Sequence, residues 1–244
     1  MVSHVQILGG SGELADWQRV AKQATEHPEV KAVAPFVQAQ GMLSFGQNVR
    51  GAMVRGVLPD MEDRVADFRP HMKSGSLDAL QADSFGIVLG SELARALGVF
   101  TGDRVTLIAP QGVVTPAGVV PRLKTFNVVG IFEVGMFEYD NGLALVAMSD
   151  AQKLYRMEDR VSGVRLKLND LFNAPRVAHE LAGKLDVDGY LSDWTRSHAN
   201  FFRAVQIEKN MMFIILSLII AVAAFNIVST LVMAVTDKQA DIAI

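Results

Sequence analysis

Residues 211–235 read MMFIILSLIIAVAAFNIVSTLVMAV, a run of 25 residues without a charged side chain. An α-helix rises about 1.5 Å per residue, so a helix of this length would reach about 37 Å. The hydrocarbon core of a bilayer is about 30 Å thick, and such a helix can cross it with some tilt. A buried core helix is the alternative, but helices of soluble domains rarely run this far without a charged face. The run therefore predicts a membrane-spanning helix, and its position late in the sequence excludes a signal peptide.

The composition of the whole chain limits the classes of partner and chemistry. It carries 23 Lys and Arg against 26 Asp and Glu, a net charge of −3, so we expect no nucleic-acid partner. There is no cysteine, which excludes disulfides and thiolate metal sites. The histidines are scattered without metal-ligand spacing, and we expect neither a metal site nor a cofactor. They are His4, His27, His71, His179 and His198.

Short apolar segments of strand and helix type fill the first 190 or so residues. Arg165 and Lys167 alternate with apolar neighbours, which predicts a half-buried strand. Ser91 and Gly98 are the expected caps of a helix between them. Ser192 or Asp193 is expected to cap a further helix that continues into the membrane. The pattern predicts an α+β domain with strands at 2–8, 31–57 (a hairpin turning at 45–48), 86–89, 104–108, 125–132, 142–147 and 164–168, and helices at 14–26, 91–97, 149–155 and 173–184.

The most unusual segment of this domain is PQGVVTPAGVVP, residues 110–121, between the strands expected at 104–108 and 125–132. It contains three prolines and several apolar residues. Proline donates no backbone hydrogen bond and resists pairing within a sheet. We therefore expect a long hairpin whose tip projects from the sheet instead of lying within it.

The predicted membrane helix has two chemically different faces. At 100° per residue, small and hydrogen-bonding side chains fall within a sector of about 80°, and bulky side chains lie opposite. Small residues on one stripe favour close helix packing in lipid, whereas the bulky stripe would face lipid or a lipid-like substrate. The packing stripe is Ala223, Asn226, Thr230 and Ala234, and the bulky stripe is Ile214, Leu218, Phe225, Val228 and Val232.

Motifs of enzyme chemistry are scarce. Glu133, Glu138 and Asp140 lie close together in the sequence, and a solvated loop explains them more simply than a pair of catalytic carboxylates. A membrane-anchored enzyme using these three residues remains an alternative. The sequence contains no G-x-S-x-G, H-E-x-x-H or P-loop motif. Any nucleotide chemistry must therefore belong to another chain, and we do not expect this one to be an enzyme.

Several segments resemble the LolC/LolE family, the membrane subunits of the lipoprotein-releasing ABC transporter of Gram-negative bacteria. They are VQIEKNMM (205–212), AVAAFNIVSTLVMAVTDKQADIAI (221–244), GIVLGSELARALGVFTGDRVTLIAP (86–110) and RVSGVRLKLNDLFNAPRV (160–177). The resemblance covers essentially the whole chain. A more distant similarity extends to the MacB and FtsX group of mechanotransmitting permeases, which drive efflux or activate cell-wall hydrolases and are the main alternative.

The resemblance implies an inner-membrane protein with four membrane helices and a large periplasmic domain between the first two. This chain would then be a fragment that lacks the first and the last two membrane helices. Its parts would be a MacB-like periplasmic core domain (1–192), a stalk helix (193–210), a transmembrane helix (211–235) and the start of a cytoplasmic coupling segment (236–244). Within the core domain, a Sabre-like insertion would occupy about 62–140, and a Porter subdomain would combine the flanking parts.

The resemblance also implies partners. A separate LolD-type ATPase would bind and hydrolyse ATP and act on the coupling segment at Asp237, Lys238, Gln239 and Asp241. A second LolC/LolE-type permease would complete a homodimer or heterodimer. The bulky stripe of the membrane helix would line the cavity for the acyl chains of the lipoprotein. Because the chain mixes LolC-like and LolE-like segments, a homodimer of the LolF type is the hypothesis we favour.

In the LolC branch, a hairpin called the hook inserts into the apolar cavity of the periplasmic chaperone LolA, and neighbouring residues form a pad. Three departures bear on chaperone binding: Ala117 stands where a large apolar residue is expected, the loop is one residue shorter, and only Lys124 keeps a charge in the pad. The corresponding hook here is Pro110, Thr115, Pro116, Ala117, Gly118, Val119, Val120 and Pro121, and the pad positions are Thr106, Leu123 and Lys124.

Overall fold

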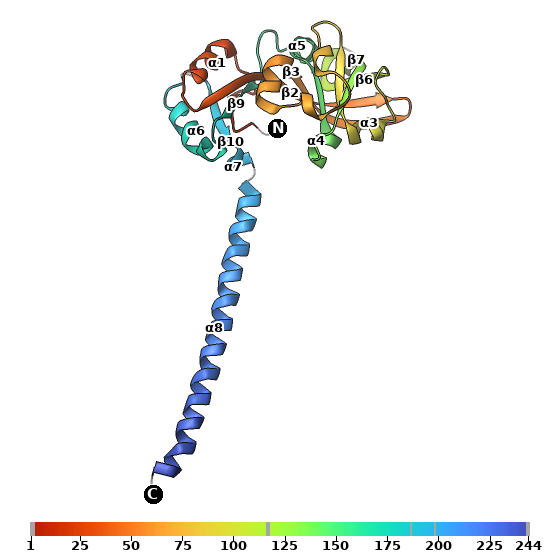
Figure 1. The fold of residues 1–244 in the computed structure, drawn as a ribbon. Coiled ribbons are helices and arrows are strands. Elements are labelled where there is room, and N and C mark those ends of the chain that lie inside the picture. Colours follow the sequence, from red (N-terminus) through yellow and green to blue (C-terminus); the bar gives the residue numbers. More distant parts are fainter. Residues whose placement is uncertain (1–2, 116–117, 186, 198, 243–244) are drawn as a thin grey trace. The chain divides into compact units, whose positions relative to one another are not determined.

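The computed structural model describes residues 3–115, 118–185, 187–197 and 199–242 (Figure 1). They fall into two compact units, Met1–Trp194 and Thr195–Ile244, which we call the domain and the helix unit and treat separately. The strands are β1 (Val5–Gly9), β2 (Val30–Phe45), β3 (Asn48–Val57), β4 (Met72–Gly75), β5 (Gly86–Gly90), β6 (Arg104–Thr115), β7 (Gly118–Phe132), β8 (Leu143–Ala147), β9 (Gly163–Leu168) and β10 (Gly189–Asp193). The α-helices are α1 (Trp17–Thr25), α2 (Pro59–Ala66), α3 (Ser91–Leu97), α4 (Phe137–Gly142), α5 (Met148–Tyr155), α6 (Ala174–Ala182), α7 (Trp194–Ser197) and α8 (Ala199–Ile242), with 3-10 turns η1 (Arg69–His71), η2 (Leu77–Ala79) and η3 (Leu171–Asn173).

The domain is built on one mixed sheet with the strand order β10-β1-β9-β2-β3-β8-β5-β7-β4, in which β6 pairs with β2 and β7. The pairs β3–β8 and β5–β7 are parallel, and the remaining pairs are antiparallel. The expected hairpin at 31–57 is confirmed, since β2 and β3 pair in register down to Phe45 opposite Asn48. The predicted α+β class is therefore correct, and the sheet is larger than the sequence indicated.

Both faces of the sheet are packed. Successive residues of β8 alternate between two apolar clusters, because side chains of a strand point to opposite faces. Ala144 and Val146 join the larger cluster, which also contains residues of α1, α3, α5 and α6. Leu143 and Leu145 join the smaller one, with residues of α2 and η2. In the smaller cluster, Phe68 and Phe132 meet edge to face at 5.3 Å.

Two local predictions are wrong, and one strand was not predicted. Arg165 is 2% exposed and forms an ion pair with Glu62, so β9 is almost wholly buried instead of half buried. Ser91 is the first residue of α3 and not its cap, which is Gly90, whereas Gly98 ends the helix with a φ of 76° as expected. The helix expected after a cap at Ser192 or Asp193 begins at Trp194, but the strand before it was not predicted: β10 pairs with β1 through Val5 opposite Asp193.

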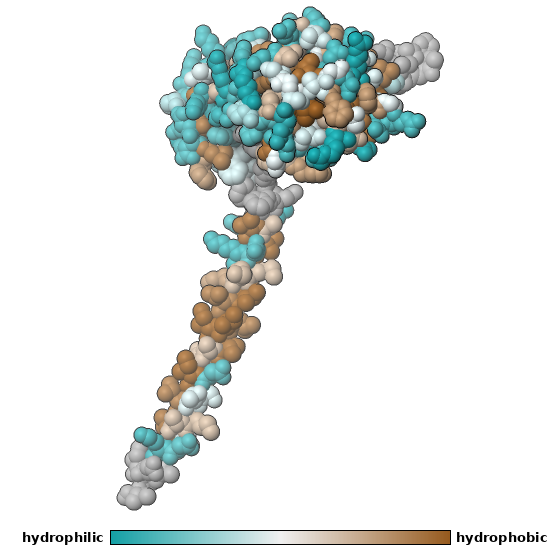
Figure 2. All heavy atoms as spheres, turned by 45° about the vertical axis from the view of Figure 1, so that its right-hand side comes forward, coloured by the Kyte–Doolittle hydropathy of each residue, from teal (hydrophilic) through white to brown (hydrophobic). Residues whose placement is uncertain are grey.

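The helix unit consists mainly of α8, a single helix of 44 residues. Within the described residues, the segment Arg203–Lys238 is long and apolar enough to cross a membrane, and a stretch of 18 residues within it has a mean hydropathy of 2.7. Figure 2 shows brown, apolar side chains along the middle of the helix, with hydrophilic residues toward either end. α8 contains the whole predicted spanning run, and its helical backbone continues beyond that run to Ile242.

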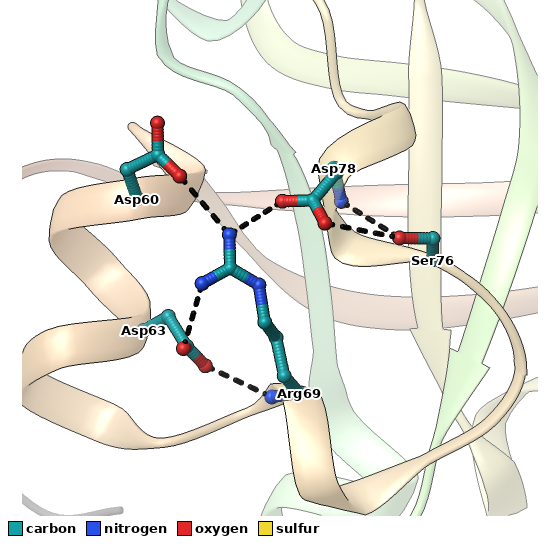
Figure 3. A network of polar contacts seen from close by, with 5 residues as sticks. All are labelled: Asp60, Asp63, Arg69, Ser76 and Asp78. Atoms are coloured by element: carbon teal, nitrogen blue, oxygen red, sulfur yellow. Dashed lines mark hydrogen bonds and ion pairs between the residues drawn. The ribbon is translucent and has the colours of Figure 1, made fainter.

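Arg69 joins three short elements of the domain (Figure 3). Its guanidinium contacts Asp60 at 3.0 Å and Asp63 at 3.0 Å, both on α2, and Asp78 of η2 at 2.6 Å. The Asp63 carboxylate also accepts the backbone N–H of Arg69. These bonds raise the pKa of Arg69, and the bond from Arg69 lowers the pKa of Asp78. We call this group the Arg69 clasp; it joins α2, η1 and η2.

Candidate functional site

The β6–β7 hairpin extends beyond the sheet that anchors it. β2 pairs with β6 only from Thr106 to Ile108. The two strands of the hairpin continue to pair with each other as far as Thr115 opposite Gly118. The predicted departure from the sheet is therefore confirmed for the described residues, and the hairpin is a two-stranded ribbon there instead of an irregular loop. Pro116 and Ala117, at the predicted tip, lie outside the described residues.

The prolines mark a break in this ribbon. Regular pairing ends at Ala109 opposite Arg122 and resumes at Val113 opposite Val120. Pro110 and Pro121 both lie in this interval, and both are exposed. Because proline has no N–H to donate, two prolines here remove two potential ladder bonds. The ribbon thus has a paired base, an irregular segment and a paired outer part.

The register of the ladder places the predicted pad on two different faces. Residues directly opposite each other in an antiparallel pair share a face. Thr106 lies opposite Thr125, and Leu123 lies opposite Ile108, on the face that we call the open face. Lys124 lies opposite the buried Leu107 and thus on the covered face, toward the larger apolar cluster. The structure brings Thr106 and Leu123 to the same face and places Lys124 on the other.

The open face is apolar near the base of the hairpin. Met42, which pairs with Ile108, is 46% exposed, and Leu123 is 60% exposed. Met42 also lines a shallow hollow of about 450 Å³ without a charged lining residue. Sequence reasoning missed this surface, because it depends on which residues of β2 and β3 are left uncovered. The hollow is lined by Gln40, Gly41, Met42, Gly51, Ala52, Met53, Pro110 and Gly142.

The acidic group at 133–140 has a structural role. Asp140 lies in α4, is 4% exposed, and accepts the N–H groups of Val134 at 2.8 Å and Gly135 at 2.9 Å. Glu133 is bound to Lys73 at 3.0 Å. The expectation of a solvated loop is wrong for Asp140, because its carboxylate folds the chain back on itself. Asp140 and Glu133 are engaged with different groups, and no group of three or more His, Asp or Glu in the described part of the chain could hold a metal ion.

Within the helix unit, the side chains of both stripes of α8 are exposed. Phe225, on the bulky stripe, is 79% exposed, and Leu218 is 65% exposed. On the other stripe, the Thr230 hydroxyl donates to the carbonyl oxygen of Asn226 at 2.8 Å, so its proton is satisfied within the helix. The predicted coupling residues Asp237, Lys238, Gln239 and Asp241 lie on the same continuous helix.

Known proteins share this architecture. A family model described as the MacB-like periplasmic core domain matches residues 2–184. The lipoprotein-releasing system transmembrane protein LolC of Neisseria meningitidis is 48% identical over 94% of this chain and 55% of its own length. The corresponding LolE of Haemophilus influenzae is 30% identical over the whole chain and 59% of its own length. The periplasmic region of MacB from Actinobacillus actinomycetemcomitans aligns with a TM-score of 0.52 at 14% identity, covering 83% of this chain and 92% of that one.

The family-model match over residues 2–184, together with the long apolar helix, places the chain in the class of permeases with a MacB-like periplasmic core domain. The chain belongs to this family, and its sequence places it with the LolC/LolE transmembrane subunits. It spans little more than half the length of the curated relatives that it matches. The similarity to the MacB structure concerns the fold alone.

Proposed function

We propose that this chain is part of a permease subunit of an ABC transporter that extracts outer-membrane lipoproteins from the inner membrane and passes them to a periplasmic chaperone. The observation that carries the proposal is the β6–β7 hairpin, whose outer strands pair only with each other among the described residues. A hairpin that leaves its sheet can enter a cavity of another protein. Relatives named for a lipoprotein-releasing system support this choice of cargo.

The hairpin and the open face would bind the chaperone together. The hook residues between Pro110 and Pro121 would enter the apolar cavity of a LolA-type chaperone. Thr106 and Leu123 would contact its rim, because they lie on the open face at the base of the hairpin. The exposed Met42 and the adjoining hollow extend this apolar contact. The pad role of Lys124 finds less support in its position on the covered face.

The membrane helix would serve the lipid part of the cargo. Each buried CH₂ group contributes about 0.8 kcal/mol, so removing several acyl chains from a bilayer requires an energy source. A LolD-type ATPase would supply it by binding and hydrolysing ATP, and it would act near Asp237 and Asp241. The bulky stripe around Phe225 would line the acyl-chain cavity, and the stripe around Ala223 would pack against other membrane helices. A second permease of the same type, in a homodimer or heterodimer, would complete this cavity.

This proposal locates the protein in the bacterial inner membrane, as a multi-pass protein with the domain in the periplasm. It is tested with the complete permease and its ATPase in nanodiscs. Replacing residues 112–120 by a two-residue Asn-Gly turn should abolish capture of the purified chaperone while ATP hydrolysis continues. A matched control, Gln47→Ala in the β2–β3 turn, should leave capture unchanged. Equal capture by the shortened variant would exclude the hook, and would favour a MacB- or FtsX-type permease.

A further inference from the structure

Two cationic side chains on the covered face of the hairpin point toward α5. Arg122 lies opposite the buried Ala109, and Lys124 lies opposite the buried Leu107. Both therefore share the face of the larger apolar cluster, to which α5 also contributes. Neither lies on the open face that holds Leu123. Each of the two side chains contacts a group that belongs to α5 or is bonded to it.

Arg122 holds the C-terminal end of α5. Its Nη1 atom donates a hydrogen bond of 2.9 Å to the carbonyl oxygen of Leu154. Leu154 is the last residue but one of the helix, and carbonyl groups of the last turn have no partner within a helix. A cation at this end also interacts favourably with the helix dipole. The contact therefore completes the helix end and attaches the hairpin to it.

Lys124 reaches the first turn of α5 through an aromatic ring. Its Nζ atom lies 3.7 Å from the centre of the Phe85 ring, and that ring packs edge to face against Phe126 at 5.7 Å. The backbone N–H of Phe85 donates to the Asp150 carboxylate at 3.0 Å, and Asp150 lies in the first turn of α5. The same carboxylate accepts the N–H of Asp83 at 2.8 Å. These bonds hold Phe85 at a φ of 49°, a conformation that is rare for a bulky residue.

We propose that Arg122 and Lys124 are positioning residues that fix the direction of the hairpin by tying its base to both ends of α5. The functional part of this inference rests on the proposed docking of the hairpin to the chaperone. In this inference Lys124 acts on the direction of the hairpin through Phe85. A displacement of α5 within the domain then carries the hairpin with it, because the two ties leave the base little freedom to pivot.

The direction of the hairpin can be measured by spin labelling. The chain has no cysteine, so two introduced cysteines are labelled selectively. With labels at Val114→Cys on β6 and Lys22→Cys on α1, double electron–electron resonance on the full chain in nanodiscs gives a distribution of distances. We expect Lys124→Gln, Phe85→Leu and Arg122→Gln each to broaden it, and Lys124→Arg to restore it, since a guanidinium also binds an aromatic face. Unchanged distributions in both Lys124→Gln and Phe85→Leu would refute the proposal. Lys124→Gln removes only an exposed side chain, so it tests the tie without altering the core.

Binding of the purified chaperone separates positioning from direct contact. Lys124→Gln and Phe85→Leu should each weaken binding about two- to fivefold. The double variant should bind the chaperone no more weakly than the single variant with the lower affinity, because both changes remove the same tie. If Phe85→Leu binds normally while Lys124→Gln does not, Lys124 contacts the partner and the proposal is wrong. If the unaltered permease fails to bind the chaperone, the docking role fails, and the label distances still decide whether the ties exist.

Discussion

Glu62 of α2 and Arg165 of β9 form an ion pair in the interior of the domain, with side chains 0% and 3% exposed. Arg55 lies on the same face of the sheet and is 8% exposed. Burial and the nearby Arg165 lower the pKa of Arg55 to about 10. One carboxylate thus faces two guanidinium groups, and it is the only charged group of α2 that is buried within the described residues.

Removing Glu62 should destabilise the domain strongly. Glu62→Ala would remove a carboxylate that two buried guanidinium groups share, and breaking a buried pair in this way costs about 3–5 kcal/mol. The loss should appear in chemical unfolding of the detergent-solubilised chain followed by tryptophan emission. Glu62→Met combined with Arg165→Met removes the pair as a whole and should recover part of the stability. If Glu62→Ala lowers the free energy of unfolding by less than about 0.5 kcal/mol, the range of ordinary surface substitutions, the pair does not have this role.

The Arg69 clasp should make residues 60–78 sensitive to acid. The hydrogen bond from Arg69 lowers the pKa of Asp78. The stability that ionised Asp78 contributes is therefore present above the ordinary pKa of 3.8 and is lost as the pH falls through the lowered pKa. We expect Arg69→Ala to speed amide hydrogen exchange across α2 and η2 at neutral pH. Acid should produce the same change in the unaltered chain. Arg95→Ala, which breaks an exposed pair on α3, is the matched control and should leave this region unchanged.

Tyr155 should ionise late in an alkaline titration. Burial raises its pKa from 10.0 to about 12, and its hydroxyl donates to the carbonyl oxygen of Gln40 at 3.3 Å. Because the folded pKa is the higher one, this contribution to stability is present below the unfolded pKa and is lost as the pH rises through the folded value. Near-ultraviolet absorbance should show one of the three tyrosines ionising at about pH 12. Tyr155→Phe should remove that component, and its persistence would assign the late titration to another residue.

A carboxylate introduced on one stripe of α8 should impair a different property of the permease than a carboxylate on the other stripe. Phe225→Asp and Ala223→Asp carry a similar insertion cost, about 2.5–3.5 kcal/mol near the helix centre, so the comparison isolates the face. With the complete permease, Phe225→Asp should reduce lipoprotein release while the permease subunits still associate. Ala223→Asp should reduce that association. Normal release by Phe225→Asp, in protein shown to be inserted, would remove the bulky stripe from the acyl-chain cavity.

Patterns that repeat locally in the sequence predicted much of the fold. The uncharged run at 211–235 identified the long helix, because spanning length and composition are properties of one segment. The turn residues at 45–48 predicted the β2–β3 hairpin, and the prolines at 110–121 predicted the departure of β6 and β7 from the sheet. In each case the signal lies within a few residues of the structure that it determines.

Features that depend on distant partners could not be predicted. The burial of Arg165 requires Glu62, which lies 103 positions away in the sequence. The face of Lys124 depends on the register of β6 against β7, and a shift of one residue would move it to the open face. β10 has only Tyr190 and Leu191 as large apolar residues, and its pairing with β1 joins opposite ends of the domain.

The helix α8 contains neither glycine nor proline between Ala199 and Ile242. Sharp kinks in helices arise almost always at such residues or at breaks in the hydrogen-bond ladder. At about 1.5 Å per residue, its 44 residues form a rod about 66 Å long, roughly twice the thickness of a hydrocarbon core. Such a rod resists stretching and bending, so a force applied at its C-terminal end would reach the other end as a rigid translation, tilt or axial rotation. A flexible hinge in the proposed transporter is therefore expected outside this helix.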